Sequence, residues 1–465
     1  MAHWRAIQPD MASIRTAPRP VLAIGAALLV VAAAAGLMDV ARRSLNSDFT
    51  VFVVAGAAFF DGRDPYEVTN TQGWHYAYTP LFALLVSPLA RLSLKGQVVV
   101  WYLISLSLGI LCVAECRWIV RSIRRRDPAA GPMPGWIAVA TALSALLPAL
   151  DSLQRGQVGL AIMWLLLLGL RLALGARGWL AAGLAGVVLA LPVEIKLTPL
   201  LPVAVLVLVG LRAGYAGGGG GTRPGHGLAL GAGLVLGLAL FVFALPGALL
   251  GWSRNVAHLE AWARRVQESA QMGVDYNKLT FRNQSFPNAA EMLARWEHPR
   301  SPLRGVLPQD PLWRNLRVEP RVPRRLLDGS VWAVQIAVCG LVVAAAWRLA
   351  GGALGAASAF GLGSALSLVV SPVSWAHHFV ALIPAVLFVP WWLWCRGGRT
   401  AARWLSWAFP ALVGVHYLLI DTAWVELHFG LSLVWTVGLL GMGTALWCGA
   451  ASVLVLAAAR STSPS

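Results

Sequence analysis

Apolar runs of about twenty residues recur along this 465-residue chain, and they constrain its fold more than any other feature. A helix of that length crosses the hydrocarbon core of a bilayer. Hydrophobic residues make up 58% of the chain and charged residues only 12%, which is about half the charged share of a soluble domain. Because only closed hydrogen-bonded structures survive in lipid, the sequence predicts an all-α polytopic membrane protein.

Twelve segments have the composition of membrane spans, and basic residues set their orientation. The cluster RSIRRR after Val120 is expected on the cytoplasmic side, which puts both chain ends inside. Thr79–Leu92 is short and holds two prolines, so we expect an interfacial or re-entrant helix on the outer side. The predicted spans are Pro20–Val40, Gly96–Val120, Trp136–Leu150, Val158–Leu174, Trp179–Val193, Leu197–Leu211, Gly227–Leu250, Leu326–Leu349, Ala353–Val370, Phe379–Cys395, Trp404–Ile420 and Leu431–Ala459.

The spans divide the chain into two bundles with loops on both sides. The Gly-rich stretch GGGGGTRPG lacks the Lys-Ser/Thr of a phosphate-binding loop, so it reads as a flexible cytoplasmic linker. The long polar segment after Leu250 is expected to cover the outer face. The predicted organisation is a cytoplasmic N-terminus (1–19), the first span with an outer loop (20–95), a first bundle (96–216), the linker (217–226), a span (227–250), an outer loop (251–325), a second bundle (326–460) and a tail (461–465).

The formal net charge of +17 would suggest nucleic acid as the partner of a soluble protein. Many of the arginines instead stand at span ends, and nothing resembles a nucleic-acid module, so the expected partner is the lipid bilayer. The five cysteines lie in or beside apolar runs without a CxxC or histidine partner. We therefore expect them to pack in the interior, and we expect neither a metal site nor a cofactor.

Polar residues collect at the outer ends of the predicted spans, which indicates a polar cavity on that side of the membrane. Asp61 and Asp64 are most simply turn residues, and Lys196 could be a lysine that reaches out from a span end. The adjacent His377 and His378 would point about 100° apart on a helix, so they suit a metal ion poorly. The set is Asp48, Asp61, Asp64, Tyr66, Tyr78, Asp151, Gln154, Arg155, Gln157, Glu194, Lys196, His377 and His378.

Asp48 has two local interpretations. It directly precedes the expected helix Phe49–Phe60, where aspartate is a favoured N-cap. It also stands in the first outer loop, where a carboxylate could act as a general base. Local sequence does not decide between a helix cap and a catalytic group.

Several segments, taken in order, resemble glycosyltransferase family 87, membrane mannosyltransferases of the GT-C class. They are SDFTVFVVAGAAFFDGRDPY, YAYTPLFALLVSPLARL, RGQVG, EIKLTPLLP, NQSFPN and SPVSWAHHF. The resemblance covers about Asp48 to His378. It implies a polyprenyl-phosphate-mannose donor and a first outer loop with a catalytic acidic residue, and it predicts a GT-C-type bundle.

The resemblance puts the catalytic carboxylate on Asp48 and places Lys196, His377 and His378 near the donor phosphate. Gln154, Arg155 and Gln157 could bind sugar hydroxyls or merely finish a turn, and Arg155 and Gln157 are further candidates for sugar or phosphate contact. Tyr78 joins this candidate set, as does Asn283, whose NQS segment could instead be loop structure.

The favoured hypothesis is a membrane hexosyltransferase on the outer face of the plasma membrane. It would move mannose or a related sugar from a polyprenyl phosphate to a glycolipid or glycan acceptor, with inversion at the sugar carbon. One alternative is a lipid-linked sugar flippase or secondary transporter, which would place ionisable residues near the bilayer midplane. Another is a non-catalytic scaffold protein, which would not need Asp48, Lys196 and His378 together.

Overall fold

The computed structural model describes residues 33–42, 44–215, 225–274, 283–294, 323–420 and 439–460. Within these ranges the regular structure is helical, and the only β pairing is an isolated bridge between Thr69 and His75. Helices long and apolar enough to cross a membrane recur along the chain. The predicted all-α polytopic class is therefore confirmed, and the protein is a multi-pass membrane protein.

The first loop forms a compact helical unit beside the bundle. It contains the 3-10 helix η2 (Ser44–Asn46), α2 (Phe49–Phe60), α3 (Pro80–Val86) and the 3-10 helix η3 (Ser87–Arg91). Helix α2 has the predicted bounds. It packs closely on α3, because a Cβ at Gly56 would lie 2.5 Å from the Ala83 carbonyl oxygen.

The first bundle is built around a close helix pair. Its elements are α4 (Leu94–Arg126), α5 (Gly135–Arg155), α6 (Gly159–Gly175), α7 (Trp179–Ile195), α8 (Leu200–Tyr215), α9 (His226–Leu238), the π-helix η4 (Ala239–Ala244) and α10 (Leu245–Leu250). Small residues let α7 and α9 touch backbone to backbone, as membrane helices often do. A Cβ at Gly233 would lie 1.9 Å from the Gly183 carbonyl oxygen.

The second bundle centres on a buried helix, α14. The remaining elements are α11 (Trp252–Val274), α12 (Phe286–Ala294), α13 (Arg324–Leu349), α14 (Ala353–Val370), the 3-10 helix η7 (Ala376–Leu382), α15 (Ile383–Cys395), α16 (Arg399–Ile420) and α18 (Leu439–Arg460). Nearly every residue of α14 is buried, and the helix packs against α8, α13 and α15. It therefore joins the two bundles into one core.

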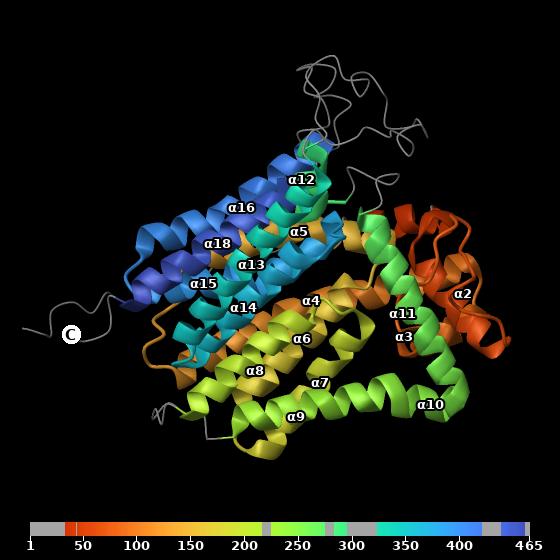
Figure 1. Cartoon of the computed structure of the whole chain (residues 1–465), viewed down its shortest axis with the longest axis horizontal. Helices are drawn as coiled ribbons and strands as arrows, with labels where there is room; N and C mark the ends of the chain where they lie inside the picture. The colour runs from red at the N-terminus through yellow and green to blue at the C-terminus, as the bar shows by residue number, and fades with distance from the viewer. Residues whose placement is uncertain are drawn as a thin grey trace, which may run out of the picture.

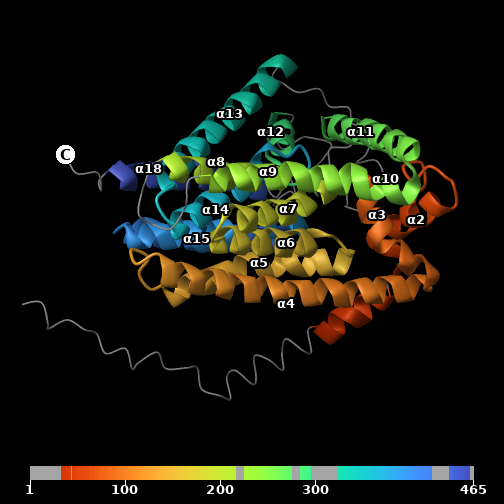
Figure 2. The same ribbon diagram turned by 90° about the horizontal axis from the view of Figure 1, so that it is seen from below.

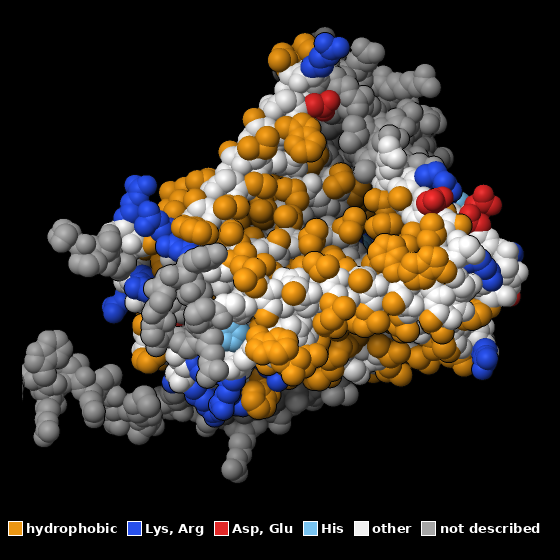
Figure 3. All heavy atoms as spheres, turned by 60° about the horizontal axis from the view of Figure 1, so that its bottom comes forward, with side chains coloured by type: hydrophobic (Ala, Val, Ile, Leu, Met, Phe, Trp, Pro, Cys, Tyr) orange, Lys and Arg blue, Asp and Glu red, His pale blue; other side chains and the backbone are white. Residues whose placement is uncertain are grey.

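The loop elements gather at one end of the bundle. Helices α2, α3, α10 and α11 lie together there, and the last residues of α18 lie at the opposite end (Figure 1). Figure 2 shows α4 running most of the length of the molecule, with α2 and α3 beside its right-hand end. A broad apolar surface lies between the two ends, and most Lys and Arg side chains stand at its edges (Figure 3).

Seven of the described helices are long and apolar enough to span a membrane, so the predicted number of twelve stays a prediction. The qualifying segments are Leu94–Arg126, Gly135–Arg155, His226–Leu250, Arg325–Leu349, Ala353–Val370, Ala376–Cys395 and Leu439–Arg460. The predicted spans that correspond to α6, α7 and α8 are shorter helices.

Some predicted features lie partly or wholly outside the described residues. The described part of the predicted first span is residues 33–40, and Gly225 and His226 are the described residues of the predicted linker 217–226. The described helical parts of the predicted outer loop 251–325 are α11, α12 and the start of α13. The domain boundaries therefore remain predictions.

Candidate functional site

Asp48 occupies the N-cap position of α2, but its side chain makes no capping hydrogen bond. Its Oδ2 instead accepts a hydrogen bond of 2.7 Å from Nε2 of Gln157, a residue 109 positions later. Its backbone N–H donates to the carbonyl of Arg155 at 2.9 Å. The capping interpretation of the side chain is therefore wrong, and the carboxylate points toward the turn between α5 and α6.

That turn is shaped for close contact with the first loop. Gly156 ends α5 in the left-handed conformation, with φ of 69°, which glycine adopts without the steric penalty of a Cβ. A Cβ there would lie 2.5 Å from Ser47 Oγ and 2.8 Å from Phe49 Cβ. Trp101 Nε1 donates to the Gly156 carbonyl at 3.0 Å, and its ring stacks on Phe49 at 4.5 Å. The glycine thus lets the Asp48 segment dock against Gln157.

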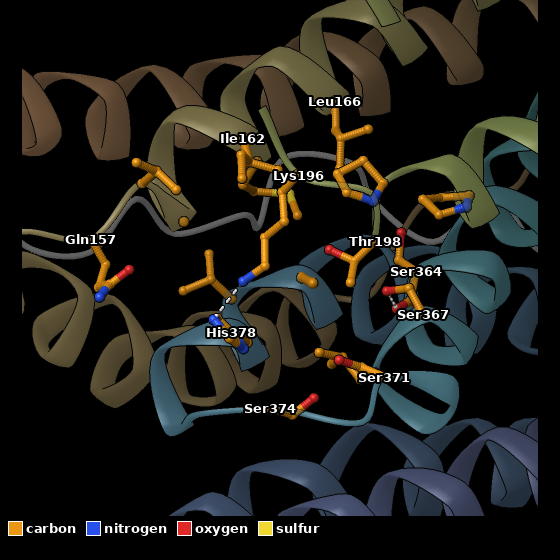
Figure 4. A pocket seen from close by; sticks show the side chains of 18 residues that line it. Gln157, Ile162, Leu166, Lys196, Thr198, Ser364, Ser367, Ser371, Ser374 and His378 are labelled. Atoms are coloured by element: carbon orange, nitrogen blue, oxygen red, sulfur yellow. Dashed lines mark hydrogen bonds between the residues drawn. The ribbon is translucent and has the colours of Figure 1, made fainter. Parts of the chain in front are cut away.

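Lys196 and His378 meet across the core. Lys196 stands in extended backbone directly after α7, outside the helix, and His378 lies on η7. The Lys196 Nζ and His378 Nε2 atoms are 2.6 Å apart, and the dashed line in Figure 4 joins them. The other ring nitrogen, Nδ1, accepts a hydrogen bond of 3.1 Å from the backbone N–H of Trp375. Burial lowers the pKa of Lys196 to about 8.

A cavity of about 50 Å³ adjoins this pair, and among the described residues that line it the ionisable ones are Lys196 and His378. Gln157, which holds Asp48, also contributes to its wall. The cavity has apolar side chains of α6 on one side and a row of hydroxyl groups on another (Figure 4). The named lining residues of these two groups are Ile162, Met163 and Leu166, and Ser364, Ser367, Ser371 and Ser374.

His377 turns away from this cavity toward α5. Its Nδ1 lies 3.3 Å from Asp151 Oδ2, and Asp151 Oδ1 accepts from Arg155 Nε at 2.8 Å. The two neighbouring histidines diverge because η7 is a 3-10 helix, in which successive residues are about 120° apart. One therefore faces the cavity and the other is packed, with its side chain 3% exposed.

Tyr78 lies next to Asp48 in an aromatic cluster. Its ring contacts Phe52 and Phe82 at centroid distances of 5.1 and 5.9 Å. Burial and then the nearby Asp48 carboxylate raise the pKa of Tyr78 above its ordinary value. The phenol is thus a neutral hydroxyl close to the carboxylate.

Asn283 fastens the segment that precedes the histidines. Its Oδ1 accepts from the backbone N–H groups of Ser285 and Ser374, at 3.1 and 3.0 Å. Its Nδ2 donates to the carbonyl of Pro372 at 3.2 Å. These bonds support the loop-structure alternative for Asn283, because they position the loop that leads to His378.

The structure therefore brings the predicted residues together in two neighbouring groups linked by Gln157. One group contains Asp48, Tyr78 and Arg155, which interacts electrostatically with Asp48. The other contains Lys196 and His378. Asp61 and Asp64 stay apart in a turn, where they bond Arg63 and the backbone N–H of Tyr66.

Two features escaped the sequence analysis. The serine row of α14 and the following loop recurs at helical spacing, and that spacing was a visible signal of a polar face. Asp151 was noted only as one of many outer polar residues, although it orients both Arg155 and His377. No local signal links Asp151 to a residue 226 positions away.

The chain can be compared with known proteins at this point. The model of glycosyltransferase family 87 matches residues 76–372, well over half of the chain. The chain belongs to glycosyltransferase family 87. The predicted enzyme class, a membrane glycosyltransferase, is thereby confirmed, and the flippase alternative is not favoured. No solved structure gives a significant match.

Two enzymes of Mycolicibacterium smegmatis are similar to this chain. A polyprenol-phosphate-mannose-dependent alpha-(1-2)-phosphatidylinositol mannoside mannosyltransferase is 27% identical over 73% of this chain and 68% of its own length. A polyprenol-phosphate-mannose-dependent alpha-(1-2)-phosphatidylinositol pentamannoside mannosyltransferase is 33% identical over 24% of this chain and 25% of its own length. The second match thus spans only a quarter of that relative.

The family match covers Tyr78, Arg155, Gln157, Lys196 and Asn283. Asp48 lies before the matched range, and His377 and His378 lie after it. The roles proposed for these three residues therefore rest on the geometry of this chain.

Proposed function

We propose that this enzyme transfers mannose from polyprenol-phosphate-mannose to a hydroxyl group of a glycolipid or glycan acceptor. Both similar enzymes are named as polyprenol-phosphate-mannose-dependent mannosyltransferases, which supports this donor. The proposed location is the outer, periplasmic or extracellular, face of the plasma membrane. The gathering of loop helices at one end of the bundle supports a site on one face (Figure 1).

One observation carries the proposal. Gln157 holds the Asp48 carboxylate at 2.7 Å and also lines the cavity that contains Lys196 and His378. A single side chain thus separates a carboxylate from a buried amine–imidazole pair. Transfer of a sugar from a phosphate requires those two functions side by side, a base for the acceptor and donors for the leaving group.

Asp48 is the proposed general base. The acceptor hydroxyl attacks the anomeric carbon as the bond between that carbon and the phosphate oxygen breaks. The hydroxyl proton passes to the Asp48 carboxylate and then to solvent. One displacement of this kind inverts the configuration at the anomeric carbon. Gln157 keeps the base directed at the site, and the Tyr78 hydroxyl lies near enough to Asp48 for the two groups to interact electrostatically.

Lys196 and His378 are the proposed partners of the donor phosphate. The phosphodiester carries one negative charge, and the departing polyprenyl phosphate gains a second as the bond breaks. Hydrogen-bond donors in a water-poor cavity stabilise such developing charge strongly. The apolar wall formed by Ile162, Met163 and Leu166 suits the isoprenoid chain that follows the phosphate.

His377 and Arg155 are proposed to shape the sugar side of the site through Asp151. The Asp151 carboxylate engages both of them, so it can hold the Arg155 guanidinium near Asp48. Remaining guanidinium donors are suited to sugar hydroxyls. Asn283 is proposed to act on the substrate through the loop it fastens rather than by direct contact.

The decisive test compares two aspartates of the same loop. Membranes that contain the wild type, Asp48→Asn or Asp61→Asn would receive labelled polyprenol-phosphate-mannose and a native lipid extract. Asp61 is the matched control, because it lies in the same loop but its side chain is exposed and pairs with the exposed Arg63. Immunoblotting would verify equal amounts of all three proteins.

We expect wild type and Asp61→Asn to label a glycolipid at similar rates, and Asp48→Asn to lose roughly a hundred-fold or more of the rate. Equal transfer by Asp48→Asn would remove Asp48 from the chemistry. If no form transfers label, the proposed donor or acceptor is wrong.

A further inference from the structure

In the hydrogen bond between Lys196 and His378, a backbone N–H group determines which side chain is the donor. The Trp375 N–H can only donate, and it points at His378 Nδ1 at 3.1 Å. Nδ1 must therefore offer its lone pair. A neutral imidazole carries its one proton on the other nitrogen, so Nε2 bears the hydrogen.

That tautomer determines the state of the lysine. Nε2 lies 2.6 Å from Lys196 Nζ, a full hydrogen-bonding contact. An ammonium group has three donors and no acceptor, so a charged lysine would turn N–H toward N–H. A neutral amine has the lone pair that the Nε2–H needs. The contact fits an uncharged Lys196 that accepts a hydrogen bond from His378.

The surroundings of Lys196 agree with this state. Its cavity is lined by apolar and hydroxyl-bearing residues from α6, α8 and α14, and no carboxylate is among the lining residues. A buried ammonium without an anionic partner is unfavourable, because it loses its hydration without gaining a compensating charge. Burial lowers the pKa of Lys196 to about 8, in the direction that geometry requires.

The other ionisable groups nearby are engaged elsewhere. The Glu194 carboxyl, two residues before Lys196, accepts a hydrogen bond from the Thr79 hydroxyl. His377 bonds Asp151, which also bonds Arg155. The Asp48 carboxylate accepts its hydrogen bond from the side-chain amide of Gln157. These carboxylates therefore bond partners other than Lys196.

We propose that under alkaline conditions Lys196 is uncharged in the empty site and takes up one proton when the phosphate of the donor enters the cavity. The inference rests on the proposed function, because it concerns the donor of that reaction. The proton comes from solvent and adds to the Nζ lone pair. The His378 Nε2–H, released from Nζ, turns to a phosphate oxygen, and the new ammonium donates to another.

Lys196 thus becomes positively charged at the same time as the donor phosphate binds. Under alkaline conditions the empty cavity holds no unpaired cation, and the occupied cavity holds an ion pair with two hydrogen-bond donors. The same ammonium then faces the second negative charge that the leaving phosphate gains. An uncharged polyprenol would trigger no proton uptake, so the cavity selects lipids that carry a phosphate.

The test is calorimetric binding of a short prenyl methyl phosphodiester to the purified full-length protein in detergent. This probe keeps one negative charge from pH 6 to 9.5, so any proton change belongs to the protein. Each pH is measured in two buffers with different ionisation heats, and the difference gives the protons taken up. The variants are Lys196→Arg, which keeps its charge, and Lys196→Met, which has no group to titrate.

We expect wild type to take up almost no proton at pH 6 and about one at pH 9.5. Its dissociation constant should rise about tenfold per pH unit above pH 8. Lys196→Arg should bind with no uptake and no such rise, and Lys196→Met should bind weakly at every pH. Size-exclusion profiles identify any variant that is misfolded.

A pH-independent affinity of wild type, or proton uptake that persists in Lys196→Met, would overturn the inference. Absence of binding even at pH 6 would do the same. Failure of the transferase proposal is distinguishable, because it appears as coupled binding without transfer of labelled mannose. Transfer without proton uptake would reject only the inference.

Discussion

At the residue scale, the central feature is that the Asp48 side chain does not cap its own helix but bonds Gln157, which is distant in the sequence. A carboxylate at an N-cap normally accepts from the first turn of its own helix. Here it accepts from Gln157 instead. A favourable local bond that is left unmade points to a constraint imposed by the rest of the site, and Gln157 is the residue that imposes it.

Replacement of Gln157 by leucine tests this link. The change keeps the side-chain size but removes the amide donor to Asp48. Because a hydrogen bond to a charged group contributes about 1.5–3 kcal/mol, we expect kcat to fall roughly ten- to a hundred-fold. Steady-state transfer kinetics measure the change. The control is Gln154→Leu, an exposed position on α5, which should leave kcat unchanged; equal losses would contradict a specific role.

At the element scale, the turn between α5 and α6 provides the surface against which the first loop and the start of α2 dock. Gly156 allows the first loop to approach within contact distance, and Trp101 clamps both the turn and Phe49. The sequence predicted RGQVG as a candidate substrate contact or a simple turn. The structure shows a turn whose Gln157 bonds Asp48, the proposed general base.

Gly156→Ala tests the turn. The new methyl group would collide with Ser47 and Phe49 in a left-handed backbone, so we expect a loss of about 2–4 kcal/mol in stability and a large loss of transfer. Thermal unfolding in detergent and the transfer assay provide the readouts. Gly62→Ala is the control, since Gly62 has φ of 73° but open space around it. A smaller effect at Gly156 than at Gly62 would show that the close approach is unimportant.

Local signals predicted local structure well. Asp48 at the N-cap position and the Asp-Gly turn after Phe60 flank α2, and the predicted bounds agree with the structure. The motifs indicated which segments contain candidate site residues, but they did not indicate which of those residues contact one another. Lys196 and His378 are 182 residues apart, and only the fold brings them together. The 3-10 geometry that separates His377 from His378 also has no clear signature in the sequence.

At the scale of the whole molecule, the motifs spread over most of the chain converge near one end. The first loop supplies Asp48, the α5–α6 turn supplies Gln157, and the second bundle supplies His378. Helix α11 fastens this arrangement from outside. Arg254 donates to the Phe59 carbonyl at 3.2 Å, and Arg265 to the Tyr66 carbonyl at 2.9 Å. The bundle thus acts as a scaffold for a site built from separate segments.

The account divides the site into a chemical part and a donor-binding part, and one measurement tests that division. Donor affinity and the single-turnover rate of mannosyl transfer would be measured in parallel at pH 7 for the wild type, Asp48→Asn and Lys196→Met. We predict that Asp48→Asn binds the donor within about threefold of wild type but transfers at least roughly a hundred-fold more slowly. Lys196→Met should instead lose affinity at least about tenfold. Normal transfer by Asp48→Asn, or unchanged donor affinity in Lys196→Met, would contradict the account.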